Sequence, residues 1–196
     1  MENNILSLLQ KEEKQHLIIK TLKRGEVLFR EGELCRHIAI VVSGQVKISS
    51  THYSGTEIVF NIIENNEIFC NNLIFSDNPF YKGDVVSLKD STIVLIEKVH
   101  LEHVLQSNKE FLLAYLKIQS NFGKKLNSTI KMLSFTSAEE RFKFYLKEHQ
   151  NIIEYRTITE LSEILYLKRE TLSRLLTKLE KENAILRSPH KITKVN

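Results

Sequence analysis

The chain has 196 residues, of which 42% are hydrophobic and 27% charged, a composition typical of a globular protein with one large or two modest domains. No apolar run approaches the roughly 20 residues of a membrane span, and two cysteines are too few for a disulfide framework. The net charge is +4, and residues 169–196 hold that whole surplus, with seven Lys and Arg against three Asp and Glu, as expected if phosphates are a partner.

The N-terminal stretch, residues 3–20, is amphipathic and predicts one or two short helices. It lacks the basic start, apolar middle and small-residue cleavage site of a signal peptide. We therefore expect a cytoplasmic protein with no membrane partner.

From residue 22 to residue 97, short runs of Val, Ile and Phe alternate with turn signals such as Ser-Gly at 43–44 and Lys-Asp at 89–90. Many short strands at regular spacing indicate a sandwich or barrel of antiparallel strands, not a parallel sheet. The first part of the chain is therefore predicted to be a β-domain.

A helical period returns after residue 98, with a short helix near 99–106 and a long one over 108–135. Apolar residues along the long helix alternate steps of three and four, which is the a/d seam of a coiled coil. Such a seam pairs most simply with a second copy of the chain in a two-fold dimer, and the alternative is packing on its own β-domain. The expected dimer interface consists of Leu112, Leu116, Gln119, Phe122, Leu126, Ile130 and Leu133.

Phe135 and Thr136 interrupt this pattern, and Ser137 with Glu140 forms a capping box for another helix. We expect an α+β protein in three parts. These are a β-domain with its N-terminal helix over 1–107, the long helix over 108–135, and a C-terminal domain over 136–196.

The C-terminal domain contains two short predicted helices, over 157–165 and 169–182, with three residues between them. A Thr-x-x-Glu capping box at 157–160 opens the first helix. Two helices joined this closely form a helix-turn-helix, whose second helix enters the DNA major groove. The alternative is an ordinary helical hairpin with a solvated charged face.

Four leucines share one face of the second helix, so its other face is expected to meet solvent. Arg can bond guanine O6 and N7 together, Glu can accept from cytosine N4, and Ser can bond either way. The segments 184–188 and 191–195 then read as a hairpin, a wing that brings basic residues to phosphates. The candidate DNA contacts are Arg169, Glu170, Thr171, Ser173, Arg174, Thr157, Lys178 and Lys191.

This order of β-roll, long helix and winged helix-turn-helix resembles the Crp/Fnr family of bacterial transcription regulators. The resemblance covers almost the whole chain. The family's GEVLFREG pattern stands at 25–32, its V-x-x-G-x-V at 41–46, and RETLSRLLTKLE at 169–180 is similar to its recognition helix nearly letter for letter. It implies a jelly-roll-like antiparallel β-roll related to cyclic nucleotide-binding domains, and a homodimer that binds palindromic double-stranded DNA.

By this resemblance, Arg169, Glu170 and Arg174 correspond to the base-reading trio, and a half-site of the TGTGA or TTGAT kind is implied. Segments 51–55 and 149–156 correspond to surfaces that touch RNA polymerase in the family. The chain departs from the pattern at Tyr166, where the family has a turn glycine, and at Lys168, where it often has a Ser N-cap.

In cyclic-nucleotide-binding relatives, a Gly-Glu pair and a later Arg-Ser pair hold the ligand. Here Cys70-Asn71 and Tyr81-Lys82 stand at those positions, and losing both Glu and Arg disfavours cyclic AMP. No cofactor is predicted, and we expect an unidentified small-molecule effector or none. The candidate effector pocket comprises Cys70, Asn71, Asn72, Tyr81, Lys82 and Asn127.

The same residues bear on other possible signals and functions. An iron-sulfur cluster needs more cysteines, and heme or metal would use Cys70 or the His100 and His103 pair. A redox switch between Cys35 and Cys70 is an alternative to inert packing. A cupin-type metalloenzyme is disfavoured because no histidine cluster occurs, so no catalytic or metal site is predicted. The intact base-reading trio argues against a scaffold subunit without DNA binding.

Overall fold

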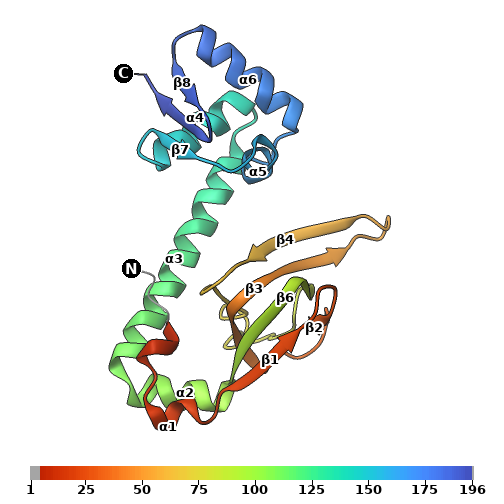
Figure 1. Cartoon of the computed structure of the whole chain (residues 1–196), viewed down its shortest axis with the longest axis vertical. Helices are drawn as coiled ribbons and strands as arrows, with labels where there is room; N and C mark the ends of the chain where they lie inside the picture. Colours follow the sequence, from red (N-terminus) through yellow and green to blue (C-terminus); the bar gives the residue numbers. More distant parts are fainter. Residues whose placement is uncertain (1–4, 196) are drawn as a thin grey trace. The chain divides into compact units, whose positions relative to one another are not determined.

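The computed structural model describes residues 5–195, and the chain divides into two compact units between Ser120 and Asn121 (Figure 1). The strands are β1 (Ile18–Leu22), β2 (Val27–Phe29), β3 (His37–Thr51), β4 (Glu57–Ile63), β5 (Ile68–Phe69), β6 (Asp84–Glu97), β7 (Ile152–Glu154), β8 (Ile185–Ser188) and β9 (Lys191–Lys194). The helices are the 3-10 helix η1 (Ile5–Leu8), α1 (Lys11–Lys14), α2 (Lys98–Ser107), α3 (Lys109–Ser134), α4 (Ala138–Glu148), α5 (Ile158–Ile164) and α6 (Arg169–Lys181). The predicted fold class is confirmed: an antiparallel β-roll, one long helix and a winged helix-turn-helix.

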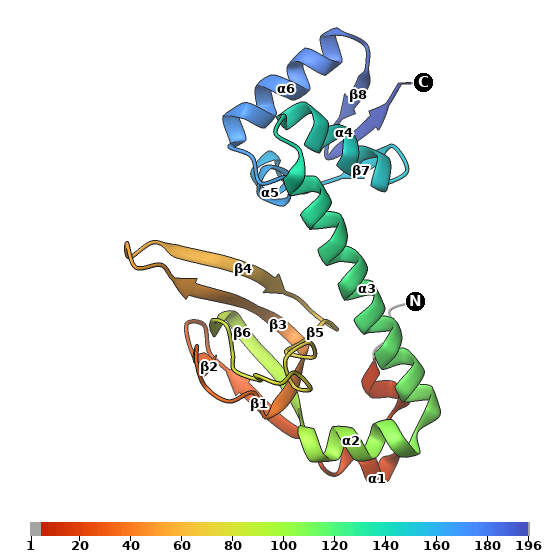
Figure 2. The same cartoon turned by 180° about the vertical axis from the view of Figure 1, so that it is seen from behind.

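The β-roll of the first unit is built around two long strands, β3 and β6. Its sheet has the order β1-β6-β3-β4, with β2 also paired to β6 and β5 to β3, and every pairing is antiparallel. Figures 1 and 2 show β3 and β4 side by side as a long hairpin. The sheet therefore has the antiparallel character that the strand spacing indicates.

The N-terminal prediction was wrong in part. Helical structure is limited to η1 and α1, and β1 begins at Ile18, inside the stretch expected to be helical. Residues 3 and 4 of that stretch lie outside the described residues. The segment becomes a strand because Ile18 pairs with Leu95 of β6, and that ladder supplies backbone hydrogen bonds over all of β1.

Two predicted turns are instead irregularities inside continuous strands. The Ser43-Gly44 pair lies within β3, and the Lys89-Asp90 pair lies within β6. The β3–β6 register shifts between Val41 and Val46, and Gly44 has a φ of 106°. A bulge with a left-handed glycine bends a strand without ending it, so the composition of a turn does not mark a chain reversal here.

The core of the first unit lies inside the β-roll and extends to α2 and α3. Ile38, Ile40 and Ile96 of the sheet are almost completely buried, as are Leu101 of α2 and Phe111 of α3. These contacts fix the N-terminal part of α3 against the β-roll.

The second unit packs α4, α5, α6 and the C-terminal end of α3 against a small sheet of order β7-β9-β8. Its core includes Phe142, Leu161, Leu172 and Ile192, all fully buried. The wing hairpin β8–β9 was predicted, whereas β7 was not. Within residues 5–195, none of the helices combines the length and apolar character that a membrane span requires.

The bulge at Gly44 leads to a stability prediction. A Cβ at this position would overlap the Ser91 side chain, whereas a Cβ at Gly55, which also has positive φ, would meet nothing within 4 Å. Gly44→Ala should therefore cost about 1–3 kcal/mol more stability than Gly55→Ala, since only the first adds overpacking to backbone strain. Scanning calorimetry of both variants measures this, and equal losses would contradict the clash.

Candidate nucleic-acid interface

The helix-turn-helix consists of α5, a short turn and α6. Thr157 caps α5, its hydroxyl accepting from the Glu160 backbone N–H at 3.0 Å, and the Glu160 carboxylate accepts from the Arg156 N–H at 2.9 Å. These bonds satisfy donors that a helix N-terminus leaves open. The first helix therefore starts where the Thr-Glu spacing predicts.

Tyr166 and Lys168 of the turn each lack a feature that would stabilise it. Tyr166 has a φ of 53°, a left-handed conformation that glycine adopts with less strain. The Tyr166 carbonyl accepts from Arg141 Nη1 of α4 at 3.2 Å, which holds the turn from outside. Lys168, the N-cap of α6, makes no side-chain cap bond.

One face of α6 is buried and the other is exposed. Leu172, Leu176 and Leu179 are almost completely buried, while Arg169 and Arg174 are exposed. Neither arginine has an ion-pair partner within residues 5–195. Both guanidinium groups are therefore available to an external acceptor. Exposure is shared by Glu170, Thr171 and Ser173.

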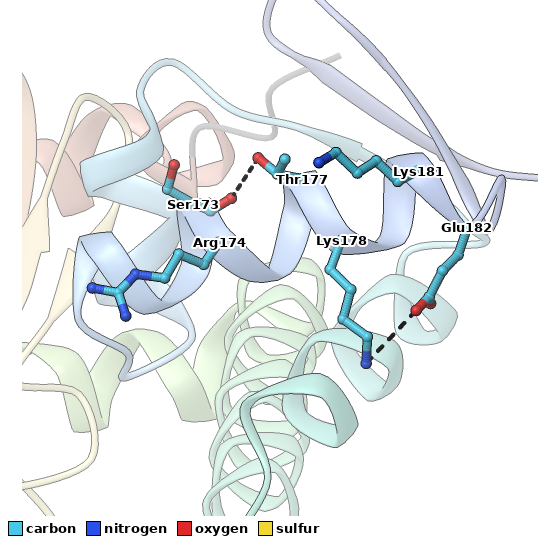
Figure 3. A pocket seen from close by; sticks show the side chains of 6 residues that line it. All are labelled: Ser173, Arg174, Thr177, Lys178, Lys181 and Glu182. Carbon is cyan, nitrogen blue, oxygen red and sulfur yellow. Dashed lines mark hydrogen bonds and ion pairs between the residues drawn. The ribbon is translucent and has the colours of Figure 1, made fainter.

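A shallow concavity of about 500 Å³ runs along the exposed face of α6 (Figure 3). We call it the α6 concavity, and it is lined by Ser173, Arg174, Thr177, Lys178, Lys181 and Glu182. Thr177 and Lys181 were not among the predicted contacts. They lie three and seven residues after Arg174 and therefore share its helix face. The sequence alone contains this spacing, so it could have identified them.

Lys178 is less available than its position on α6 suggests. Its Nζ lies 2.9 Å from a carboxylate oxygen of Glu139 in α4 and 3.9 Å from one of Glu182. Hydrogen bonds from Lys143 and Lys178 lower the pKa of Glu139 to about 2, so that carboxylate is charged at neutral pH. Lys178 thus joins α6 to α4 by ion pairing.

The wing lies beside the start of α5. A second concavity, of about 640 Å³, is lined by Glu154, Tyr155, Arg156, Glu160, Pro189, His190 and Lys191. Lys191 Nζ lies 3.7 Å from Glu154 of β7, and Arg187 Nη1 lies 3.5 Å from Glu180 of α6. The strand β7, which the sequence analysis did not predict, therefore places the Glu154 carboxylate close to Lys191, the predicted phosphate contact.

The predicted effector-pocket residues fall into three environments. Cys70, Asn71 and Tyr81 are buried, whereas Asn72 and Lys82 are exposed. The sixth residue, Asn127, is exposed on the part of α3 in the second unit. Membership of all six in one pocket stays a prediction.

Asn71 is a hydrogen-bonding centre inside the first unit. Its carbonyl accepts from Tyr115 Oη at 3.1 Å and from Gln119 Nε2 at 2.8 Å, and its Nδ2 donates to Gln119 Oε1 at 3.1 Å. Gln119, a predicted interface residue, is therefore turned toward its own β-roll. The other predicted seam residues divide into Leu112, which is half-buried, and Leu116, Phe122, Leu126, Ile130 and Leu133, which are 40–59% exposed.

Comparison with known proteins agrees with this architecture. Residues 19–108 match the model of the cyclic nucleotide-binding domain family. The anaerobic regulatory protein of Bacillus subtilis (strain 168) is 25% identical over 114 residues, which is 58% of this chain and 48% of that protein. The match thus spans about half the length of that relative.

Two solved structures share the fold. A CooA variant from Carboxydothermus hydrogenoformans superimposes with a TM-score of 0.71 at 16% identity, covering 100% of this chain and 91% of that one. The catabolite activator protein of Thermus thermophilus gives 0.56 at 19% identity, covering 98% and 94%. Residues 19–108 thus form a domain similar to the cyclic nucleotide-binding domain family, and the whole chain shares the fold of these two solved structures.

Proposed function

We propose that this protein is a sequence-specific DNA-binding regulator that reads a palindromic site as a homodimer. The observation that carries the proposal is the exposed start of α6, where Arg169 and Arg174 have no ion-pair partner within residues 5–195. Each can bond guanine O6 and N7 together, and Glu170 can accept from cytosine N4. A good bidentate contact discriminates against the wrong base by about 1–3 kcal/mol.

The α3 seam supports the homodimer. In our proposal the interface centres on the exposed residues Leu116, Leu126 and Ile130, flanked by Phe122 and Leu133. Gln119 and Leu112 take a lesser part because they face the chain's own β-roll or are half-buried. A two-fold dimer places two copies of α6 on half-sites with centres roughly 34 Å apart.

Phosphate contacts would come from the wing, from the start of α5 and from the exposed face of α6. Thr157 lies at the N-terminus of α5, Lys191 lines the neighbouring concavity, and Lys181 lines the α6 concavity. Contacts of this kind position a protein on the duplex without reading sequence. Lys181 and Lys191 are two of the seven basic residues in the range 169–196.

The sensor pocket is proposed to be degenerate, with a signal other than cyclic AMP. Tyr81 is buried and Lys82 exposed at the place where the family's phosphate-binding pair would stand, and a lysine lacks the bidentate fork of arginine. The Bacillus subtilis relative is named as an anaerobic regulator, and the proposal gives this chain a comparable cytoplasmic role. Contact with RNA polymerase through 51–55 and 149–156 belongs to the same proposal.

Selection from a random duplex pool at physiological salt tests the proposal directly. We expect enrichment of an inverted repeat, with G·C pairs in each half-site. Recovery of sequences without two-fold symmetry from both reduced and oxidised protein would overturn it.

Replacing Arg174 and replacing Lys191 should change DNA binding in different ways. Arg174→Ala should relax the preference at one base pair in each half-site, because a base contact is lost. Lys191→Ala should weaken binding to all DNA sequences alike, because a phosphate contact is lost. The slope of log affinity against log salt concentration should become shallower by about 1. Titrations on specific and scrambled duplexes separate these effects, and equal losses of Arg174→Ala on both would refute base reading.

A substitution of Leu126 tests the proposed dimer interface on α3. Leu126→Asp should raise the dimer dissociation constant by about 30-fold or more, the effect of losing about 2 kcal/mol at an interface centre. Leu113→Asp is the matched control, because Leu113 is 57% exposed on the same helix but lies outside the three-and-four spacing. Sedimentation velocity measures both, and a dimeric Leu126→Asp variant would rule this interface out.

Glu139 is predicted to limit DNA affinity through Lys178. Glu139→Gln should release the Lys178 ammonium group and so tighten binding to all duplexes, with a salt slope steeper by about 1. Glu140→Gln controls for the change in net charge, because Glu140 makes no ion pair within residues 5–195. If the two variants bind alike in salt titrations, Lys178 is not held back by its ion pair.

A further inference from the structure

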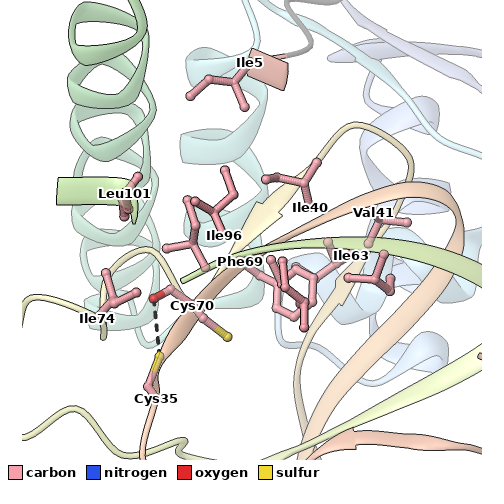
Figure 4. Packing of buried hydrophobic residues seen from close by; sticks show 14 of the residues in the cluster. Ile5, Cys35, Ile40, Val41, Ile63, Phe69, Cys70, Ile74, Ile96 and Leu101 are labelled. Atoms are coloured by element: carbon pink, nitrogen blue, oxygen red, sulfur yellow. Dashed lines mark hydrogen bonds between the residues drawn. The ribbon is translucent and has the colours of Figure 1, made fainter. Parts of the chain in front are cut away.

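The two cysteines of the chain lie against each other in the core of the first unit. Cys35 is 2% exposed and Cys70 is 5% exposed, although 35 positions separate them in the sequence. Cys35 Sγ lies 4.0 Å from the Cys70 carbonyl and donates to the His37 carbonyl at 3.5 Å (Figure 4). Both thiols are reduced. Their side chains thus share one small part of the core.

Their surroundings differentiate the two sulfurs. A hydrogen bond from the Cys70 thiol lowers the pKa of Cys35 to about 7, outweighing burial, with smaller contributions from Tyr81, the backbone of His37 and the charge of Lys98. The Cys35 contact and burial raise the pKa of Cys70. At neutral pH, Cys35 is therefore the nucleophile of the pair and Cys70 remains a thiol.

Tyr81 adds a second feature to the site. Its hydroxyl is buried and makes no well-aligned hydrogen bond within residues 5–195. Burying a hydroxyl without a hydrogen bond costs free energy of folding, so such a group normally has a functional reason to be there. Its polarity favours the Cys35 thiolate beside it.

Cys70 is also connected to the long helix. It has a φ of 63°, a left-handed conformation that is strained for a residue with a side chain. The next residue, Asn71, holds Tyr115 and Gln119 of α3 through three hydrogen bonds. A change of conformation at Cys70 would therefore act directly on the residues that attach α3 to the β-roll.

We propose that Cys35 and Cys70 form a thiol–disulfide switch that responds to hydrogen peroxide, and that Asn71 transmits its state to α3. The inference names a signal for the regulator proposed above. Its chemistry is measured without DNA, so its failure and a failure of DNA binding are distinguishable.

The reaction balances with one peroxide. The Cys35 thiolate attacks a peroxide oxygen and the O–O bond breaks, giving a sulfenic acid, while the hydroxide released takes up the proton that Cys35 lost. The Cys70 sulfur then attacks the sulfenic sulfur, forming the S–S bond and breaking the S–O bond, and its proton leaves with that oxygen as water. Two thiols are oxidised to a disulfide, and hydrogen peroxide is reduced to two waters. Burial selects a small uncharged oxidant over a bulky disulfide.

The experiment treats reduced full-length protein with hydrogen peroxide, alkylates the remaining thiols and measures the intact mass. The wild type should lose two hydrogens and both alkylation sites without dimerising covalently. Cys70→Ser should stop at a sulfenic acid that dimedone traps, and Cys35→Ser should consume peroxide roughly tenfold more slowly. Two free thiols in treated, folded wild type, or equal rates for Cys35→Ser and wild type, would overturn the switch.

Tyr81→Phe and hydrogen exchange complete the test. Tyr81→Phe removes only the hydroxyl, so the protein should stay folded while the pH midpoint of the peroxide reaction moves upward. Oxidised wild type should exchange amide hydrogens faster over residues 115–119 than reduced protein, and treated Cys70→Ser should not. An unchanged midpoint would remove Tyr81 from the mechanism, and unchanged exchange would refute transmission to α3.

Discussion

The apolar stripe of α6 is the contact on which the proposed function depends. Burial of Leu172, Leu176 and Leu179 fixes the rotation of the helix about its axis. Each buried leucine contributes about 1.5–3 kcal/mol, so turning the stripe toward solvent would cost more than the turn strain at Tyr166. Arg169 and Arg174 consequently face outward. DNA reading would thus rest on a rigid helix whose orientation is decided by its hydrophobic face.

Along α3, in contrast to α6, only part of the apolar surface is buried. Its N-terminal part is held to the β-roll by Phe111 and by the Asn71 network, while Leu126 and Ile130 remain uncovered farther along. Within residues 5–195, one helix therefore combines a buried core contact with an exposed apolar face. The regulator that we propose would need this combination, because a change at the β-roll end could then alter the packing of the exposed face.

The β-roll matches the cyclic nucleotide-binding domain family over residues 19–108, but in our proposal other residues occupy its ligand positions. Cys70 and Tyr81 are core residues, buried near Cys35 and away from open solvent. In the proposed alignment with cyclic-nucleotide-binding relatives, the missing Glu and Arg would be the groups that hold ribose and phosphate. Thiol chemistry in the same place is compatible with that loss, since it needs only two sulfurs, a strained backbone and a link to α3.

The sequence by itself determined the elements whose signals are local. The leucine spacing of α6, the seam of α3 and the Thr157 cap each depend on residues within about two helical turns, so their periodicity is readable directly. Only the tertiary structure decided that β3 continues through the bulge at Gly44 and that β7 pairs with the wing strand β9. It also decided that Lys178 forms an ion pair with Glu139 and that Cys35 lies beside Cys70. Those features depend on partners distant in sequence, and one-dimensional patterns contain no information on such distances.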